Sequence, residues 1–114
     1  MKFTLNLEAV PQGRPRFTRT GIAYDAPKSR KFKQDLALLI TPPHELLTGE
    51  LKVELKIYKR GKLTGRRFGD VDNLAKGILD ALTGLIWRDD SQIISLKIEK
   101  AVGEPLIEIE IEEC

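Results

Sequence analysis

Residues 70–92 read DVDNLAKGILDALTGLIWRDDSQ, a helical apolar period with an acidic pair at each end. The period predicts an amphipathic helix from about Val71 to Thr83, with Gly84 suited to cap its C-terminus. Trp87, just beyond the helix, is expected to be a core residue rather than a wedge between bases. The stripe that this helix would bury consists of Leu74, Ile78, Leu82 and Leu85.

Apolar and polar residues alternate in four segments around this helix, which predicts four half-buried strands. A second amphipathic helix is predicted from Pro27 to Ile40, because the apolar period there is helical and Thr41-Pro42-Pro43 ends it. The order strand, helix, strand, helix, strand, strand predicts an α+β (mixed α/β) fold, with a single sheet of about four strands covered by two helices. The alternating residues are Phe3, Leu5 and Leu7; Leu51, Val53, Leu55 and Ile57; Ile94, Leu96 and Ile98; and Ile107, Ile109 and Ile111.

Length and composition fit one domain. A chain of 114 residues with 41% hydrophobic content can bury one core without disulfides or structural metals, so we expect a single domain over residues 1–114. Neither a signal-peptide pattern nor an apolar run of about 18 residues is present, which predicts a soluble cytoplasmic protein without membrane attachment. Cys114 and His44 are each the only residue of their type, which excludes an internal disulfide and a Cys/His zinc site. Any metal would therefore be bound by carboxylates.

The small net charge of +2 hides two halves of opposite sign. Residues 1–69 contain 15 Lys and Arg against 6 Asp and Glu, a balance of +9, whereas residues 70–114 contain 4 against 11, a balance of −7. A basic half can neutralise phosphates, and a group of carboxylates can hold a hard divalent cation such as Mg²⁺. This distribution of charge is typical of an enzyme that cuts nucleic acid.

The acidic residues have an ordinary structural explanation that must be weighed. Asp72, Lys76 and Asp80 lie on one helix face, where an aspartate at the helix start can cap it and pair with the lysine one turn on. The second pair, Asp89 and Asp90, is harder to explain in this way, because Arg88 is the only cation nearby. If four uncompensated carboxylates were brought together, their mutual repulsion would cost roughly several kcal/mol without a counter-ion. A bound divalent cation would remove that cost.

Three basic clusters occupy the first half of the chain. A solvated charged surface is the ordinary explanation for any one of them. Three clusters without interleaved acids, one of them continuous with Asp70, favour contact with phosphates instead. The clusters are Arg14, Arg16 and Arg19, with Phe17 and Tyr24 interleaved; Lys28, Arg30, Lys31 and Lys33; and Lys59, Arg60, Lys62, Arg66 and Arg67. The residues singled out as DNA contacts are Arg14, Arg16, Arg19, Lys31, Arg66 and Arg67.

Residues 70–92 resemble the RusA endodeoxyribonuclease family, which resolves Holliday junctions. Its members begin a helix with aspartate-x-aspartate-asparagine, carry a lysine four residues beyond the second aspartate and a DAL segment, and follow with tryptophan, paired aspartates and a glutamine. The opening strand is also similar to the phage-type branch of the family, so the resemblance spans most of the chain. The matching residues are Asp70, Asp72, Asn73, Lys76, Asp80-Ala81-Leu82, Trp87, Asp89-Asp90 and Gln92, with Pro11, Arg14, Pro15 and Arg16 near the opening strand.

The resemblance implies a function and a set of site residues. Asp70, Asp72 and Asp90 would be the catalytic, metal-binding carboxylates for Mg²⁺, which Mn²⁺ can replace; Lys76 would be an essential catalytic cation, and Asp89 is a candidate for an additional acid. A homodimer would resolve four-way DNA junctions by paired symmetric cuts, in recombination and repair. Two alternatives remain open: a less selective branched-DNA or flap nuclease, and a non-catalytic DNA-binding accessory protein.

The predicted helix also constrains how the site is assembled. A helix of about 14 residues is roughly 20 Å long, and Asp90 lies about six residues beyond its far end, a connection that spans ~20 Å only when extended. Either Leu85 to Asp89 return along the helix in an extended conformation, or Asp89 and Asp90 meet the Asp70 and Asp72 pair of a two-fold partner. We favour the second arrangement, because a composite site would tie cutting to assembly.

Overall fold

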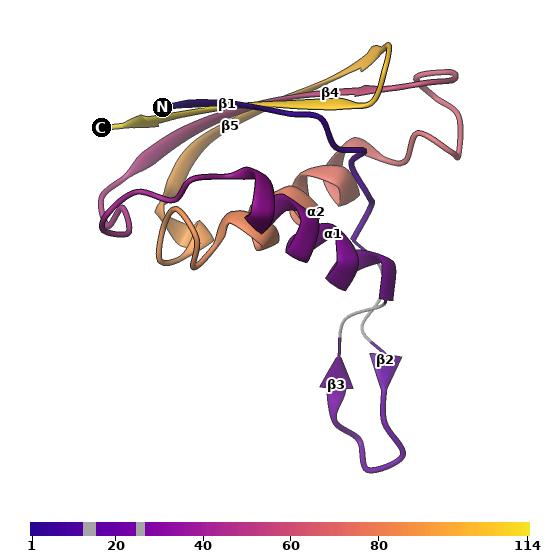
Figure 1. Cartoon of the computed structure of the whole chain (residues 1–114), viewed down its shortest axis with the longest axis horizontal. Helices are drawn as coiled ribbons and strands as arrows, with labels where there is room; N and C mark the ends of the chain where they lie inside the picture. Colours follow the sequence, from indigo (N-terminus) through magenta and orange to yellow (C-terminus); the bar gives the residue numbers. More distant parts are fainter. Residues whose placement is uncertain (13–15, 25–26) are drawn as a thin grey trace.

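A four-stranded mixed sheet and two helices form two layers in the computed structural model, which describes residues 1–12, 16–24 and 27–114 (Figure 1). Both helices lie on the same face of the sheet. The predicted α+β fold and its order of elements are therefore confirmed. The elements of the two layers are β1 (Lys2–Leu5), α1 (Pro27–Leu39), β4 (Leu51–Lys59), α2 (Val71–Leu82), β5 (Ile93–Val102) and β6 (Leu106–Glu113).

The strand order across the sheet is β1-β6-β4-β5. The central strand β4 is antiparallel to β6 and parallel to β5, and β1 is antiparallel to β6. A parallel pair needs a crossover connection, and α2 supplies it between β4 and β5. The helix consequently spans the sheet between the end of one strand and the start of its neighbour, with β1 and β5 as the two edges.

The core lies between the sheet and the helices. In β4 the odd-numbered residues are buried and the even-numbered ones face the other side, as the alternation predicts. Trp87 is fully buried, and its Nε1 donates a 3.1 Å hydrogen bond to the hydroxyl of Thr83, which confirms its predicted place in the core. Among the described residues, no helix has the length and apolar character that crossing a bilayer requires. The residues that α1 and α2 bury against the sheet include Phe32, Leu36, Leu74, Ile78 and Leu82.

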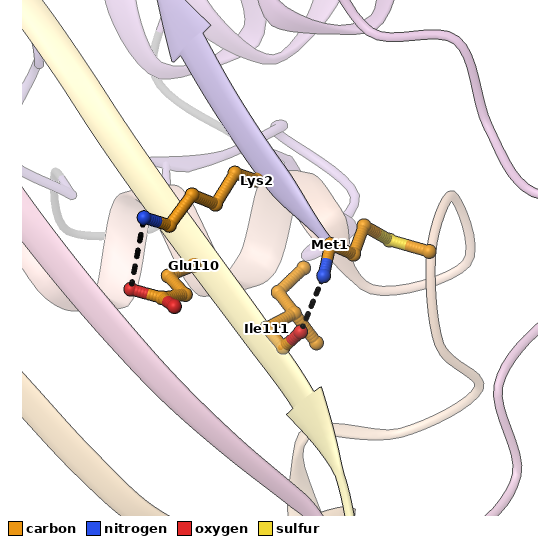
Figure 2. A network of polar contacts seen from close by, with 4 residues as sticks. All are labelled: Met1, Lys2, Glu110 and Ile111. Carbon is orange, nitrogen blue, oxygen red and sulfur yellow. Dashed lines mark hydrogen bonds and ion pairs between the residues drawn. The ribbon is translucent and has the colours of Figure 1, made fainter.

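The opposite face of the sheet carries charged side chains. Lysines and glutamates of all four strands share it, so this face is suited to water rather than to a further layer. Figure 2 shows the β1 side of it, where the N-terminal ammonium of Met1 donates to the carbonyl of Ile111 at 3.1 Å and Lys2 lies 4.0 Å from Glu110. These contacts stabilise the pairing of the short β1 with β6. The charged residues of this face include Lys52, Glu54, Lys56, Lys97, Glu99, Glu108 and Glu110.

A small hairpin projects away from the two layers (Figure 1). Its strands are β2 (Arg16–Phe17) and β3 (Ala23–Tyr24), paired antiparallel. The turn between them is closed by a 3.0 Å hydrogen bond from the amide of Gly21 to the carbonyl of Thr18. The sequence indicated only a loop here, because strands of two residues are too short to show an alternating pattern.

Candidate functional site

The first acidic pair lies at the start of α2, where it is free of the ordinary helix-start roles. Asp70 is the N-cap residue, yet its side chain makes no capping hydrogen bond. Asp72 and Lys76 are exposed one turn apart, and Lys76 forms no ion pair with either Asp72 or Asp80. The carboxylates of Asp70 and Asp72 and the ammonium group of Lys76 are thus available to a ligand at the positive end of the helix dipole.

Two glycines let the chain pack closely around this helix start. A Cβ atom on Gly77 would lie 2.8 Å from the carbonyl oxygen of Val10, so the segment before the hairpin crosses α2 at backbone distance. Gly69 has φ +94, and a Cβ there would lie 2.7 Å from Pro11. The residue directly before Asp70 therefore has to be glycine for the chain to turn into α2 beneath this segment.

The basic loop of residues 60–69 is anchored by two lysines that point at it from the sheet. The buried ammonium group of Lys59 donates to the carbonyls of Arg67 and Phe68, both at 3.0 Å, and that of Lys100 donates to the carbonyl of Leu63 at 2.9 Å. Both ammonium groups lie over the buried ring of Phe68, at 5.8 and 5.1 Å from its centre. Burial lowers the pKa of Lys59. Lys59 therefore holds the loop from inside, and the partly exposed Lys100 binds it at its edge.

The arginines of the same loop are exposed. Arg66 and Arg67 form no ion pair with any other residue that the structure describes, and the loop leads directly into Asp70. Sequence reasoning grouped Lys59 with these arginines as one basic cluster. The signal that separates it was present: Lys59 continues the buried odd-numbered positions of β4.

The second acidic pair begins a single 3₁₀ turn, η1 (Asp90–Gln92), just before β5. The Asp89 carboxylate accepts from the amide of Ser91 at 3.2 Å, and the Gln92 side chain accepts from the amide of Asp89 at 2.8 Å, which makes a reciprocal capping box. Gln92 also donates to the carbonyl of Leu47 at 2.9 Å. Sequence reasoning missed this structural role of Asp89 and Gln92, although the spacing of a capping box is visible in DDSQ.

The two adjacent carboxylates shift each other's pKa. Hydrogen bonding to the amide of Ser91 holds the pKa of Asp89 below its ordinary value. The pKa of Asp90 is raised, first by its hydrogen bond with Asp89, then by the loss of some hydration and by the negative charges of Asp89 and Asp80. The neighbouring carboxylates thus repel the charged form of Asp90, and a bound cation would reduce this repulsion.

One chain does not bring the two acidic pairs together. The connection after α2 is a compact turn, closed by hydrogen bonds from Gly84 to Trp87 at 2.7 Å and from Ile86 to Leu82 at 2.9 Å. It does not run back along the helix, which at 12 residues is about 18 Å long. Asp90 consequently stays at the far end of α2. Accordingly, no three His, Cys, Asp or Glu side chains within the described ranges are grouped so that they could hold a metal ion.

The other candidate DNA contacts that the structure describes lie in the hairpin and on α1. Arg19 is exposed in the turn of the projecting hairpin, and Arg16 belongs to its first strand. Lys31 is exposed on α1 but pairs with Asp35 at 2.8 Å, so its charge is already partly compensated. Arg14 lies outside the residues that the structure describes.

Comparisons with known proteins identify a family and a similar protein. A family model described as endodeoxyribonuclease RusA matches residues 6–112, which include both acidic pairs and all three basic clusters. The uncharacterized protein YqaN of Bacillus subtilis (strain 168) is 37% identical over 136 residues, covering 99% of this chain and 96% of that protein.

Proposed function

The chain belongs to the RusA endodeoxyribonuclease family, and from this we propose that it is a Mg²⁺-dependent nuclease that resolves four-way DNA junctions in recombination and repair. The observation that carries the proposal is the state of Asp70 and Lys76. Both occupy positions that normally serve a helix, as N-cap and as ion-pair partner, and neither side chain is used in that way. Charged groups left free beside an arginine-bearing loop are suited to a phosphate substrate.

The donor chemistry fits Mg²⁺. Asp70 and Asp72 offer exposed carboxylate oxygens, and Mg²⁺ binds through one or two carboxylates together with waters and substrate phosphate. The same oxygen donors accept Mn²⁺. When bound, the metal ion supplies activation of the attacking water and neutralisation of charge on the phosphate.

The chain's own residues would position the DNA and stabilise its developing charge. Lys76, one turn beyond Asp72, would donate to a phosphate oxygen as negative charge grows in the transition state. Arg66 and Arg67 would hold the neighbouring backbone, which fixes orientation but reads no sequence. Lys59 would act as a positioning residue, because it holds the carbonyls of this loop.

A homodimer supplies what one chain lacks. Since Asp90 remains a helix length away from Asp70 and Asp72, we propose that each site combines Asp70 and Asp72 of one chain with the partner's Asp90. Two such sites are related by a two-fold axis, and paired symmetric cuts in a four-way junction require that symmetry.

One assay tests this function against its alternatives. The protein is incubated with a labelled four-way junction, a flap and a linear duplex, each with Mg²⁺ and with EDTA. We expect paired cuts in the junction alone, only with Mg²⁺, and none from an Asp70→Asn variant. Equal cutting of flap and junction would identify a less selective nuclease. Tight junction binding without cutting under any metal would identify a DNA-binding accessory protein.

A further inference from the structure

The two edge strands of the sheet differ, and only one of them is suited to pair with another strand. The β1 edge is four residues long and begins with a charged residue, Lys2. The β5 edge is ten residues long and exposes three large apolar side chains, Ile94 at 54%, Leu96 at 42% and Val102 at 60%. Within the described structure β5 pairs only with β4, so its outer backbone groups are available. A long apolar edge of this kind is a template for another strand.

The two faces of β5 also differ. Leu96 and Ile98 stand opposite Val53 and Leu55 of β4 and therefore lie on the face that the helices cover. Leu96 is nevertheless exposed, so the helix layer leaves this edge bare. On the open face, Lys97 and Glu99 form an ion pair at 3.4 Å within the strand. On the face that the helices cover, the edge thus presents Leu96 and Ile98, followed by Lys100. On the open face it presents a charged pair of opposite sign.

This pattern is complementary to itself. Consider two copies of β5 paired antiparallel about a two-fold axis perpendicular to the sheet. Residues directly opposite each other then lie on the same face, and the sum of their two residue numbers is constant along the pair. An axis at Ile98 sets Lys97 opposite the partner's Glu99, and Glu99 opposite the partner's Lys97. Four charges of alternating sign then meet on the open face. On the face that the helices cover, Ile98 meets its own copy and Leu96 falls opposite the partner's Lys100. The ammonium group of Lys100 is already bound to the carbonyl of Leu63 in its own chain.

Neighbouring registers lack this complementarity. An axis at Lys97 sets Lys97 against its own copy, and an axis at Glu99 does the same for Glu99, so each places like charges directly opposite one another. We propose that the β5 edge is the surface on which a second copy of this chain docks, antiparallel and with the two-fold axis at Ile98, joining two four-stranded sheets into one.

The proposed interface also explains how Asp70 and Asp72 of one chain could form a site with the partner's Asp90. This explanation rests on the proposed function, whereas the docking surface itself does not. Asp90 directly precedes β5, whereas the loop that leads into Asp70 is bound at the other end of the strand, where Lys100 donates to Leu63. Antiparallel pairing brings the start of one β5 to the end of the other. The Asp90 end of each chain therefore approaches the Asp70 end of its partner.

A charge-swap pair tests the register without any nuclease assay. Lys97→Glu alone sets two glutamates opposite two glutamates, and Glu99→Lys alone sets lysines opposite lysines. We expect each variant to dimerise at least tenfold more weakly than the parent in sedimentation equilibrium, and an equimolar mixture to recover dimers that contain one chain of each. Dimers of either variant as tight as the parent's, or a mixture no tighter than its components, would overturn the register.

Disulfide trapping gives an independent readout, on a Cys114→Ser background. Lys97→Cys and Glu99→Cys chains should cross-link under mild oxidation when mixed, whereas either chain alone should not, since its cysteines would be two residues out of register. Leu96→Lys should shift the parent to monomer, with Thr4→Lys on the β1 edge as the matched control. A Leu96→Lys protein that stays folded by circular dichroism and fully dimeric would place the interface elsewhere.

Discussion

The ammonium group of Lys59 donates a 3.0 Å hydrogen bond to the main-chain carbonyl of Phe68 and lies 5.8 Å from the centre of that residue's ring. A lysine at the end of a buried strand row thus holds the loop that carries Arg66 and Arg67 to the start of α2. Its charge stabilises two carbonyls rather than contacting the exterior, because the side chain points into the core beneath the loop.

Lys59→Met keeps the aliphatic stem but leaves the carbonyls of Arg67 and Phe68 without their donor. We expect a loss of about 2–4 kcal/mol in the free energy of unfolding, since each unsatisfied buried carbonyl costs about 1–3 kcal/mol. Urea unfolding measures the change, and junction binding should weaken as well because the loop loses its anchor. Lys52→Met, on the open face of the same strand, is the control. Equal stability of the two variants would contradict the anchoring role.

Asp70→Asn and Asp72→Asn preserve shape and remove the charge expected to hold the metal ion. Junction cleavage should fall by roughly 100-fold or more, equivalent to about 2.7 kcal/mol of transition-state stabilisation. Junction binding should persist or tighten, because a negative charge facing phosphate is gone. Glu112→Gln, on the open face of the sheet, controls for net charge. Near-normal turnover in both aspartate variants would reduce the pair to surface residues.

Arg66→Ala and Arg67→Ala should weaken binding to junction and linear duplex alike. Each lost phosphate contact should lower the slope of log affinity against log salt by about 0.9. Lys31→Ala should change the slope less, because Lys31 already pairs with Asp35. Titrations at four salt concentrations measure all three variants. An unchanged slope for both arginine variants would mean that the loop does not touch DNA.

Asp90→Asn should raise stability at neutral pH while abolishing cleavage. The pKa of Asp90 is raised in the folded chain above the ordinary 3.8, so its protonated form is favoured by folding, and that contribution is lost as pH rises through the folded pKa. The asparagine variant does not ionise, so its free energy of unfolding does not decrease in this way as pH rises. Its advantage should be below about 1 kcal/mol, because the side chain is exposed, and it should vanish as pH falls below about 3.8, where the parent carboxyl is protonated as well. Thermal unfolding from pH 3 to 7 checks the trend, and a variant less stable than the parent at pH 7 would contradict it.

The sequence was most informative where an element buries one face. The alternation at Leu51 to Ile57 and the helical stripe from Leu74 to Leu82 predicted β4 and α2, because each pattern repeats over several residues. The hairpin formed by β2 and β3 was missed, since strands of two residues carry no period. The roles of Lys59 and Gln92 were also missed, because both depend on which backbone groups they meet in the folded chain.

For the candidate site, helix length alone indicated that Asp90 would not reach Asp70 through a compact connection, and the compact turn after α2 agrees with that argument. Which element would receive a partner depends on the strand order. Only the folded sheet reveals that β5 is an edge while β4 and β6 are not.

Mixing two inactive variants tests whether the site is shared between chains. Asp70→Asn and Asp90→Asn homodimers should each be inactive, because both of their sites carry one lesion. In a heterodimer with composite sites, one site collects both lesions and the other is intact, so nicking of a four-way junction should reappear after subunit exchange. Each heterodimer should nick one strand without making the paired cut. If the exchanged mixture stays as inactive as its parents, the three carboxylates belong to one chain, and the compact turn after α2 would have to open for catalysis.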